Sequence, residues 1–176
     1  MLKLSVTVAV TIYCAVCVLM YIMQRSLLYF PTAPAVNISE KAVTFHNGEV
    51  SLQGWVLNPG HSKAIVYFAG NAEQIEHDIS FFKRNFADIS VYLVNYRGYG
   101  NSSGQPTEAG LFSDALAIYD QIKTHHPDIT VMGRSLGTAV ATYLAANRAV
   151  SHLILVTPFD SIVNVAQQNY PLLPVS

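Results

Sequence analysis

The chain has 176 residues, a length that suits one domain with a small addition. Hydrophobic residues make up 51% of it and charged residues only 12%, against a usual charged share of about a quarter, and the formal net charge is -1. This balance leaves no polycationic face and argues against a nucleic-acid partner. Both cysteines, Cys14 and Cys17, lie in the first apolar stretch, which excludes a disulfide framework or a cysteine metal site in the rest of the chain.

Residues 4–23 carry no charge, and as a helix they would span about 30 Å, the thickness of a bilayer's hydrocarbon core. A cleaved signal peptide would have a shorter apolar region followed by a small-x-small site, which residues 24–28 do not provide. A buried helix of a soluble protein would usually show a polar face. We therefore expect an uncleaved transmembrane anchor over residues 1–25, with the N-terminus inside and the following domain outside the cytoplasm.

Residues 26–40 contain two prolines and a polar cluster, and we interpret them as a linker leaving the membrane. Residues 41–176 alternate strand and helix signals. A hairpin is indicated by the turn Asn47-Gly48 between two strand patterns. We expect strands over residues 41–46, 50–57, 64–69, 89–95, 129–132 and 152–156, and helices over residues 73–85, 108–123 and 135–147.

This alternation predicts an α/β fold with right-handed crossovers, a doubly wound and mostly parallel sheet, and helices on both faces. The opening hairpin is a common antiparallel variation at the edge of such sheets.

The pattern GxSxG occupies residues 133–137, with Ser135 at its centre. By itself this pattern is a modest signal, but here it stands between a buried strand and a helix, as a nucleophile elbow requires. The flanking glycines give room for the tight turn, and the helix N-terminus directs backbone amides toward the serine. The competing interpretation is a glycine-flanked serine that caps an ordinary helix.

Two more loops follow predicted strands. The turn at residues 68–72 stands where a second oxyanion donor is expected, and we assign that donor to the amide of Asn71, opposite the amide of Leu136. A simple Gly-Asn turn is the alternative. Residues 95–104 predict a sharp loop at the carboxyl edge of the sheet, where ligands bind. In that loop we expect Arg97 to hold the backbone by bonding carbonyl groups rather than to bind substrate.

Residues 67–72 (YFAGNA), 95–100 (NYRGYG) and 133–137 (GRSLG) together resemble the membrane-anchored α/β-hydrolase-domain proteins, often described as dienelactone-hydrolase-like or serine-aminopeptidase-like. Residues 24–31 are similar to the membrane-exit segment of that family. The resemblance implies an α/β-hydrolase fold and serine hydrolase activity. Ala69 stands where the family usually has histidine, but the donor in this loop is a backbone amide.

The acid and base of a catalytic triad are not evident. This fold orders them as Ser, then Asp or Glu, then His. After Ser135 the sequence has only His152, which opens a strand, and Asp160, which we expect to cap the next helix. The earlier histidines are expected to be surface or turn residues: His46, His61, His77, His125 and His126. With six of about eight strands accounted for, we expect the triad Asp and His to lie beyond residue 176.

The preferred function is therefore a serine hydrolase that cleaves an ester, thioester or amide through an acyl-enzyme on Ser135. The alternative is an inactive membrane-tethered hydrolase-like protein that binds a partner or serves as a scaffold. The expected partners are a small acyl substrate, lipid-like if the membrane supplies it, and the membrane itself. Neither a cofactor nor a metal ion is expected, because the serine mechanism needs none.

Overall fold

The computed structural model describes residues 2–36, 38–161, 163–164 and 167 of the chain. Pro31–Pro158 forms one compact unit, while Met1–Phe30 and Phe159–Ser176 lie outside it. Outside this unit, helix α1 (Leu2–Leu28) is long and apolar enough to cross a membrane. The helix predicted from the uncharged run is therefore present. It continues past that run to Leu28, a few residues before Pro31 would interrupt it.

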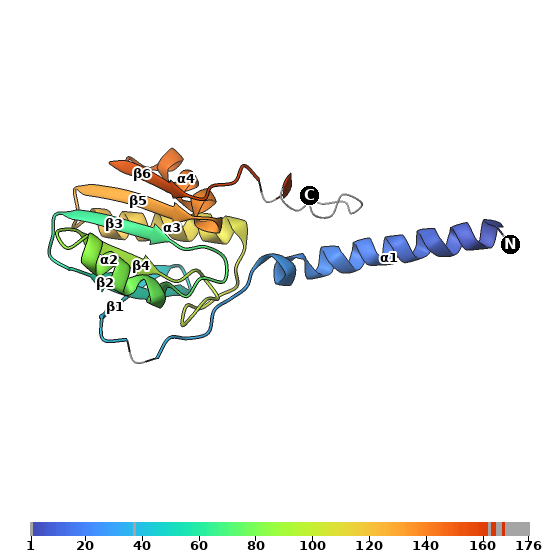
Figure 1. Ribbon diagram of the computed structural model, residues 1–176, viewed down its shortest axis with the longest axis horizontal. Coiled ribbons are helices and arrows are strands. Elements are labelled where there is room, and N and C mark those ends of the chain that lie inside the picture. The colour runs from blue at the N-terminus through green and yellow to red at the C-terminus, as the bar shows by residue number, and fades with distance from the viewer. Residues whose placement is uncertain (1, 37, 162, 165–166, 168–176) are drawn as a thin grey trace. The chain divides into compact units, whose positions relative to one another are not determined.

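The compact unit is built on a sheet of six strands in the order β1-β2-β4-β3-β5-β6, seen in Figure 1 from β1 to β6. The strands β3, β4, β5 and β6 are mutually parallel, whereas β2 is antiparallel to both of its neighbours, β1 and β4. The predicted mostly parallel sheet with an antiparallel hairpin is confirmed. The strands are β1 (Lys41–Asn47), β2 (Val50–Leu57), β3 (Lys63–Phe68), β4 (Ser90–Val94), β5 (Asp128–Arg134) and β6 (His152–Val156).

Helices cover both faces of this sheet. Helix α2 (Ile79–Asn85) packs on one face, and α3 (Glu108–Lys123) and α4 (Leu136–Asn147) pack together on the other, as Figure 1 shows. Buried side chains alternate along β3 because successive residues of a strand face opposite sides. Ile65 and Tyr67 join the cluster around Phe82 of α2, so Val66 and Phe68 point toward α3 and α4.

Two local predictions need correction. The hairpin turn consists of Gly48 and Glu49, because Asn47 still pairs with Val50 in the ladder. The helix expected over residues 73–85 begins only at residue 75, as the 3-10 turn η1 (Ile75–Asp78), and α2 follows it directly. The preceding residues are held in a turn, in which Ala72 has a positive φ of 60°, and the helix cannot start there.

Candidate active site

A sharp turn between strand and helix is centred on Ser135. Strand β5 ends at Arg134 and α4 begins at Leu136, so this single residue joins a strand to a helix. Its φ of 48° and ψ of -116° are unusual for a residue with a side chain and cost about 1 to 3 kcal/mol. Backbone bonds hold it there: its amide donates to the carbonyl of Val156 at 3.0 Å, and its carbonyl accepts from the amide of Thr138 at 2.8 Å.

Both glycines of the pattern are required by close packing. A Cβ on Gly133 would collide with the backbone carbonyl of Gly137 in the first turn of α4. A Cβ on Gly137 would collide in turn with the backbone carbonyl of Phe68, the last residue of β3. These contacts place the start of α4 directly against the end of β3, which brings Ser135 close to the loop that follows Phe68.

That loop, residues 69–72, lies beside the serine. A Cβ built on Gly70 would be 3.6 Å from the Cβ of Ser135 and 3.8 Å from the carbonyl oxygen of Arg134. The structure therefore brings Ser135 together with the segment that carries Asn71. Leu136 is the first residue of α4, where amides have no acceptor within the helix. Backbone donors from a helix N-terminus can stabilise an oxyanion at such a position.

Two tyrosines that the sequence analysis did not single out brace the 69–72 loop. The hydroxyl of Tyr96 donates to the carbonyl of Ala69 at 2.7 Å, and the hydroxyl of Tyr99 donates to Oδ1 of Asn71 at 2.8 Å. Both tyrosines are buried and belong to the segment after β4. Burial raises the pKa of Tyr96 well above its usual value, so it stays a donor. Since β3 and β4 are parallel neighbours, the loops after them meet at one edge of the sheet.

Glu73 provides a third brace. Its Oε2 accepts from the amide of Gly70 at 2.6 Å, and its Oε1 accepts from the hydroxyl of Tyr67 at 2.5 Å. Nη1 of Arg134 lies 3.4 Å from the same Oε1. Burial raises the pKa of Glu73, but hydrogen bonds from Tyr67, Asp78 and the Gly70 amide outweigh it, so the pKa falls below its usual value. Glu73 is therefore a carboxylate, and no feature of its sequence context had pointed to it.

Backbone strain gathers at the same edge. Among the described residues, four that are not glycine have positive φ: Asn58, Ala72, Ser135 and Thr157. Three of them follow the carboxyl ends of parallel strands, namely Ala72 after β3, Ser135 after β5 and Thr157 after β6. In α/β sheets ligands bind at this edge, and strained backbone is concentrated at functional sites.

The interpretation of Arg97 was partly wrong. Its guanidinium makes two bonds to the carboxylate of Asp114 on α3, at 2.7 and 2.6 Å, rather than bonds to carbonyl groups. The side chain of Asn47 also donates to Asp114, at 2.8 Å. Arg97 thus holds the loop after β4, as predicted, but does so by an ion pair with a neighbouring helix.

His152 lies far from Ser135. It pairs with Thr130, whereas Val156 at the other end of β6 pairs with Arg134, next to the serine. Four strand residues separate these levels by about 13 Å. Asp160 bonds its own surroundings, accepting from the amide of Ser161 at 2.8 Å and from the side chain of Asn164 at 2.7 Å.

The capping oxygen for the residues after Asp160 comes from Ser161, whose hydroxyl accepts from the amides of Val163 and Asn164 at 3.1 and 3.4 Å. The expectation that Asp160 caps the next helix was therefore wrong in its residue, because Ser161 accepts from these amides. The hydrogen bond from Asn164, with that from the Ser161 amide, lowers the pKa of Asp160.

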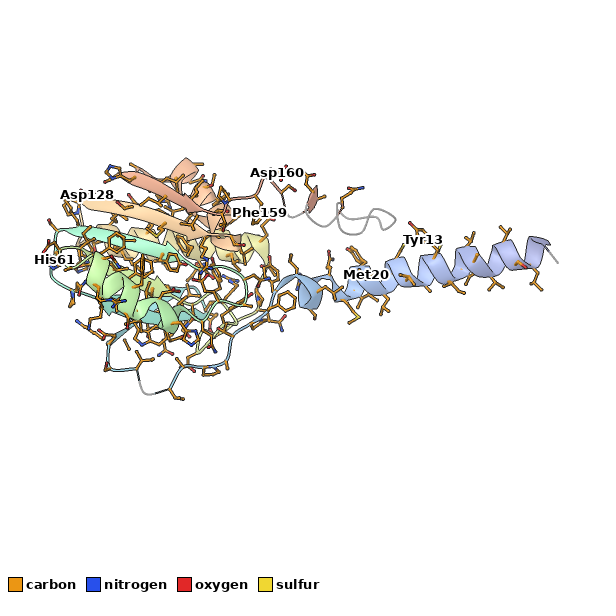
Figure 2. The ribbon with its side chains drawn as sticks, viewed as in Figure 1. Tyr13, Met20, His61, Asp128, Phe159 and Asp160 are labelled. Atoms are coloured by element: carbon orange, nitrogen blue, oxygen red, sulfur yellow. The ribbon has the colours of Figure 1, made fainter. Side chains whose placement is uncertain are left out.

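Two of the histidines that precede Ser135, His61 and His126, lie at the opposite edge of the sheet from it. Figure 2 labels His61 just before β3 and Asp128 at the start of β5, at the amino ends of these strands. His126 is buried beside them and bonds the hydroxyl of Tyr92 and the carbonyl of His61. Among the described residues, no three His, Cys, Asp or Glu side chains are grouped to hold a metal ion.

Comparison with known proteins gives a consistent result. Residues 56–174 match the alpha/beta hydrolase fold family. The chain is 33% identical to the uncharacterized protein Rv2307c of Mycobacterium tuberculosis, over 96% of this chain and 66% of that protein. It is 33% identical to the uncharacterized membrane protein YNL320W of Saccharomyces cerevisiae, over 76% of this chain and 50% of that protein. It is also 33% identical to lysophosphatidylserine lipase ABHD12 of Macaca fascicularis, over 73% and 35%.

Solved structures share the fold. The DcsB complex with its substrate analogue matches with a TM-score of 0.62 at 22% identity, over 75% of this chain and 50% of that one. The Pyrococcus furiosus esterase Pf2001 matches with a TM-score of 0.60 at 16% identity, over 84% and 64%. The chain spans between half and two thirds of the length of the first relatives that it matches.

Proposed function

Because the chain belongs to the α/β-hydrolase fold family, we propose that it is the part of a membrane-tethered serine hydrolase that carries the nucleophile, Ser135. The observation that supports this proposal is the strained turn between β5 and α4, packed against the 69–72 loop. An ordinary helix cap does not need a positive φ, whereas a nucleophile elbow holds its serine in such a conformation.

The reaction would follow the acyl-enzyme route. The hydroxyl oxygen of Ser135 attacks the carbonyl carbon of an ester, thioester or amide, while a base takes the hydroxyl proton. The resulting oxyanion accepts hydrogen bonds from the amides of Leu136 and Asn71, each worth about 3 to 4 kcal/mol in related sites. Collapse of the intermediate expels the alcohol, thiol or amine, which receives the proton, and water then releases the acyl group from the serine.

Because His152 opens β6 at the level of Thr130 and Asp160 bonds its neighbours Ser161 and Asn164, we propose neither as the base or its acid partner. In this fold they follow the nucleophile in the order acid, then histidine. We propose that they belong to the part of the complete protein that corresponds to the unmatched length of the relatives.

A lipid-like acyl ester is the substrate class that we propose. One relative is named a lysophosphatidylserine lipase. Helix α1 is apolar and long enough to span a bilayer, so it would keep the hydrolase unit at a membrane surface, where such substrates lie. We further propose that the α/β unit is on the extracytoplasmic side, with residues 1–25 as the anchor, residues 26–40 as the linker and residues 41–176 as the start of the hydrolase domain.

One experiment tests both the anchor and the nucleophile. Membranes that contain the complete protein are washed with alkaline carbonate and then treated with a fluorescent fluorophosphonate, which phosphonylates activated serines. We expect one labelled band that stays in the pellet, and we expect Ser135→Ala to remove the label. Ser102→Ala is the matched control and should label normally, because the hydroxyl of Ser102 bonds the backbone of Gln53 and Asn95.

The alternative, an inactive tethered scaffold, has one observation in its favour: among the described residues no histidine is placed by its bonds beside Ser135. A scaffold would fractionate with the pellet but would not react with the probe. Labelling that persists in Ser135→Ala would place the nucleophile elsewhere.

A further inference from the structure

Glu73 contacts both segments of the candidate site, the 69–72 loop and the end of β5 before Ser135. It follows the 69–72 loop by one residue, yet its carboxylate turns back to bond the amide of Gly70 and lies near Arg134, the residue before the serine. We propose that Glu73 is a positioning residue that fixes the 69–72 loop against the Ser135 turn and so orients the second oxyanion donor. This inference rests on the proposed hydrolase function.

The bond to Gly70 determines which amide the loop presents. A backbone amide bonded to a carboxylate at 2.6 Å is fully engaged, so the amide of Gly70 points toward Glu73 and is not available to a substrate. Its direction also fixes the plane of the peptide that precedes Gly70. The hydroxyl of Tyr99 holds the next residue through Oδ1 of Asn71. With both residues held, the orientation of the Asn71 amide depends on Glu73 and Tyr99.

The other oxygen of Glu73 anchors the carboxylate to the sheet. Oε1 accepts from the hydroxyl of Tyr67, which projects from β3 into the core shared with α2. The Glu73 side chain is only 13% exposed, so these bonds are shielded from water and their geometry is well defined. Burial raises the pKa of Tyr67 first, and its hydrogen bond to Glu73 raises it further, so the phenol remains a donor.

Arg134 helps to position the 69–72 loop but contributes little to stability. Its side chain is 51% exposed and its Nη1 lies 3.4 Å from Oε1 of Glu73, a geometry that contributes little to stability. It nevertheless connects the loop after β3 to the residue that precedes Ser135 on β5. A shift of the loop would therefore have to break a contact with the serine's own strand.

The groups that face Glu73 keep it ionised. Tyr67 on β3 and the Gly70 amide donate to it, Arg134 on β5 is cationic, and Asp78 on η1 hydrogen-bonds it. Burial, followed by the hydrogen bond and the charge of Glu73, raises the pKa of Asp78 to about 6, partly offset by Arg134 and His77. As the pH falls toward 6, Asp78 is thus the member of the pair that takes up a proton first, and Glu73 stays an acceptor for the loop.

The test compares variants of the complete protein by turnover of an activated acyl ester, with the active serines counted by fluorophosphonate labelling. Glu73→Ala removes both acceptors and should lower kcat per labelled serine by roughly 100-fold with KM changed less than about twofold, because misplacing a donor by about 1 Å has an effect of this size. Glu73→Gln keeps one carbonyl acceptor for the Gly70 amide and should lose only roughly tenfold in kcat.

Glu76→Gln is the matched control, since it removes one carboxylate charge from η1, and its kcat should stay within about twofold of the wild type. A purely structural role would reduce the melting temperature or the number of labelled serines but leave kcat per labelled serine unchanged in both Glu73 variants. That result would overturn the inference while the proposed function stands. If the wild-type protein neither labels nor turns over the ester, the proposed function fails, and the inference fails with it.

Discussion

The two edges of the parallel sheet differ in how they hold their backbone. At the amino edge the one described non-glycine residue with positive φ is Asn58, a residue type that tolerates this conformation. Its side chain donates to the carbonyl of Phe86 at 2.9 Å, which secures the turn. At the carboxyl edge the residues with positive φ are Ala72, Ser135 and Thr157, residue types for which the conformation is costly.

The two edges also differ in what the hydrogen bonds of their side chains hold in place. At the amino edge, His126 is buried, and in the neutral ring Nδ1–H donates to the carbonyl of His61 at 2.9 Å while Nε2 accepts from the hydroxyl of Tyr92 at 2.8 Å. Its hydrogen-bonding capacity is fully used within the fold. At the carboxyl edge, the bonds of Tyr96, Tyr99 and Glu73 orient a loop around a half-buried serine.

If the proposed function is correct, the amino edge contributes stability and the carboxyl edge stores strain that serves the reactivity of Ser135. Substitutions at the two edges should therefore separate the free energy of unfolding from reactivity toward the fluorophosphonate. All unfolding measurements below refer to the complete protein in detergent micelles, unfolded by urea.

The largest effect is expected at the carboxyl edge, from Gly137→Ala. Alanine is the better helix former by about 1 kcal/mol, so helix propensity alone predicts a more stable protein. Its Cβ would collide with the backbone carbonyl of Phe68, which cannot move without displacing β3. We expect a loss of roughly 3 kcal/mol or more in the free energy of unfolding, together with loss of labelling.

The matched control for this prediction is Gly48→Ala in the β1–β2 turn. There φ is 58° and a new Cβ would meet no atom within 4 Å, so only backbone strain of about 1 kcal/mol is expected. A Gly137→Ala protein as stable as the wild type would show that β3 and α4 are not in the close contact described.

How much the sequence could predict depends on the range of the interaction concerned. The strands, the helices over residues 108–123 and 135–147, and the strand-turn-helix position of Ser135 follow from local patterns, and these agree with the structure to within about two residues. Local patterns suffice here because a buried parallel strand reads as a continuous apolar run.

Contacts that hold the site could not be predicted in the same way. Tyr99 meets Asn71 across 28 positions of the chain and Arg97 meets Asp114 across 17, and each pairing depends on how two loops or a loop and a helix approach. Glu73 looked like the start of a helix because its neighbours have helical spacing. Its carboxylate is instead used by Gly70, three residues earlier, and the helical residues begin later.

An intermediate effect is expected at the amino edge, from His126→Leu. The substitution replaces the polar ring by an apolar side chain of similar size and leaves the Tyr92 hydroxyl and the His61 carbonyl without their partner. Unsatisfied groups of this kind cost about 1 to 3 kcal/mol, and we expect a loss of about 2 kcal/mol in the free energy of unfolding. Labelling of the folded protein should not change.

His125→Leu serves as the control for that variant. This neighbouring ring is exposed and bonds only Thr124 among the described contacts, so its loss should change stability by less than about 0.5 kcal/mol. Reduced labelling in folded His126→Leu protein would contradict the division of roles between the edges, since it would mean that the amino edge also shapes the serine turn.

The smallest effect, and the one whose sign is most informative, is expected from Ser135→Gly compared with Ser135→Ala. Alanine keeps the Cβ that makes a φ of 48° and a ψ of -116° costly, whereas glycine reaches this conformation without a steric penalty. The strain removed is about 1 to 3 kcal/mol, and glycine loses about 0.5 to 1 kcal/mol more backbone entropy on folding. Both variants lack the hydroxyl, so neither should label. We expect Ser135→Gly to be more stable than Ser135→Ala by about 1 kcal/mol, the reverse of the usual order of these two residues. A Ser135→Gly protein less stable than Ser135→Ala would mean that the turn is relaxed with a side chain present. The carboxyl edge would then hold its serine without stored strain, and the contrast between the two edges would rest on hydrogen bonding alone.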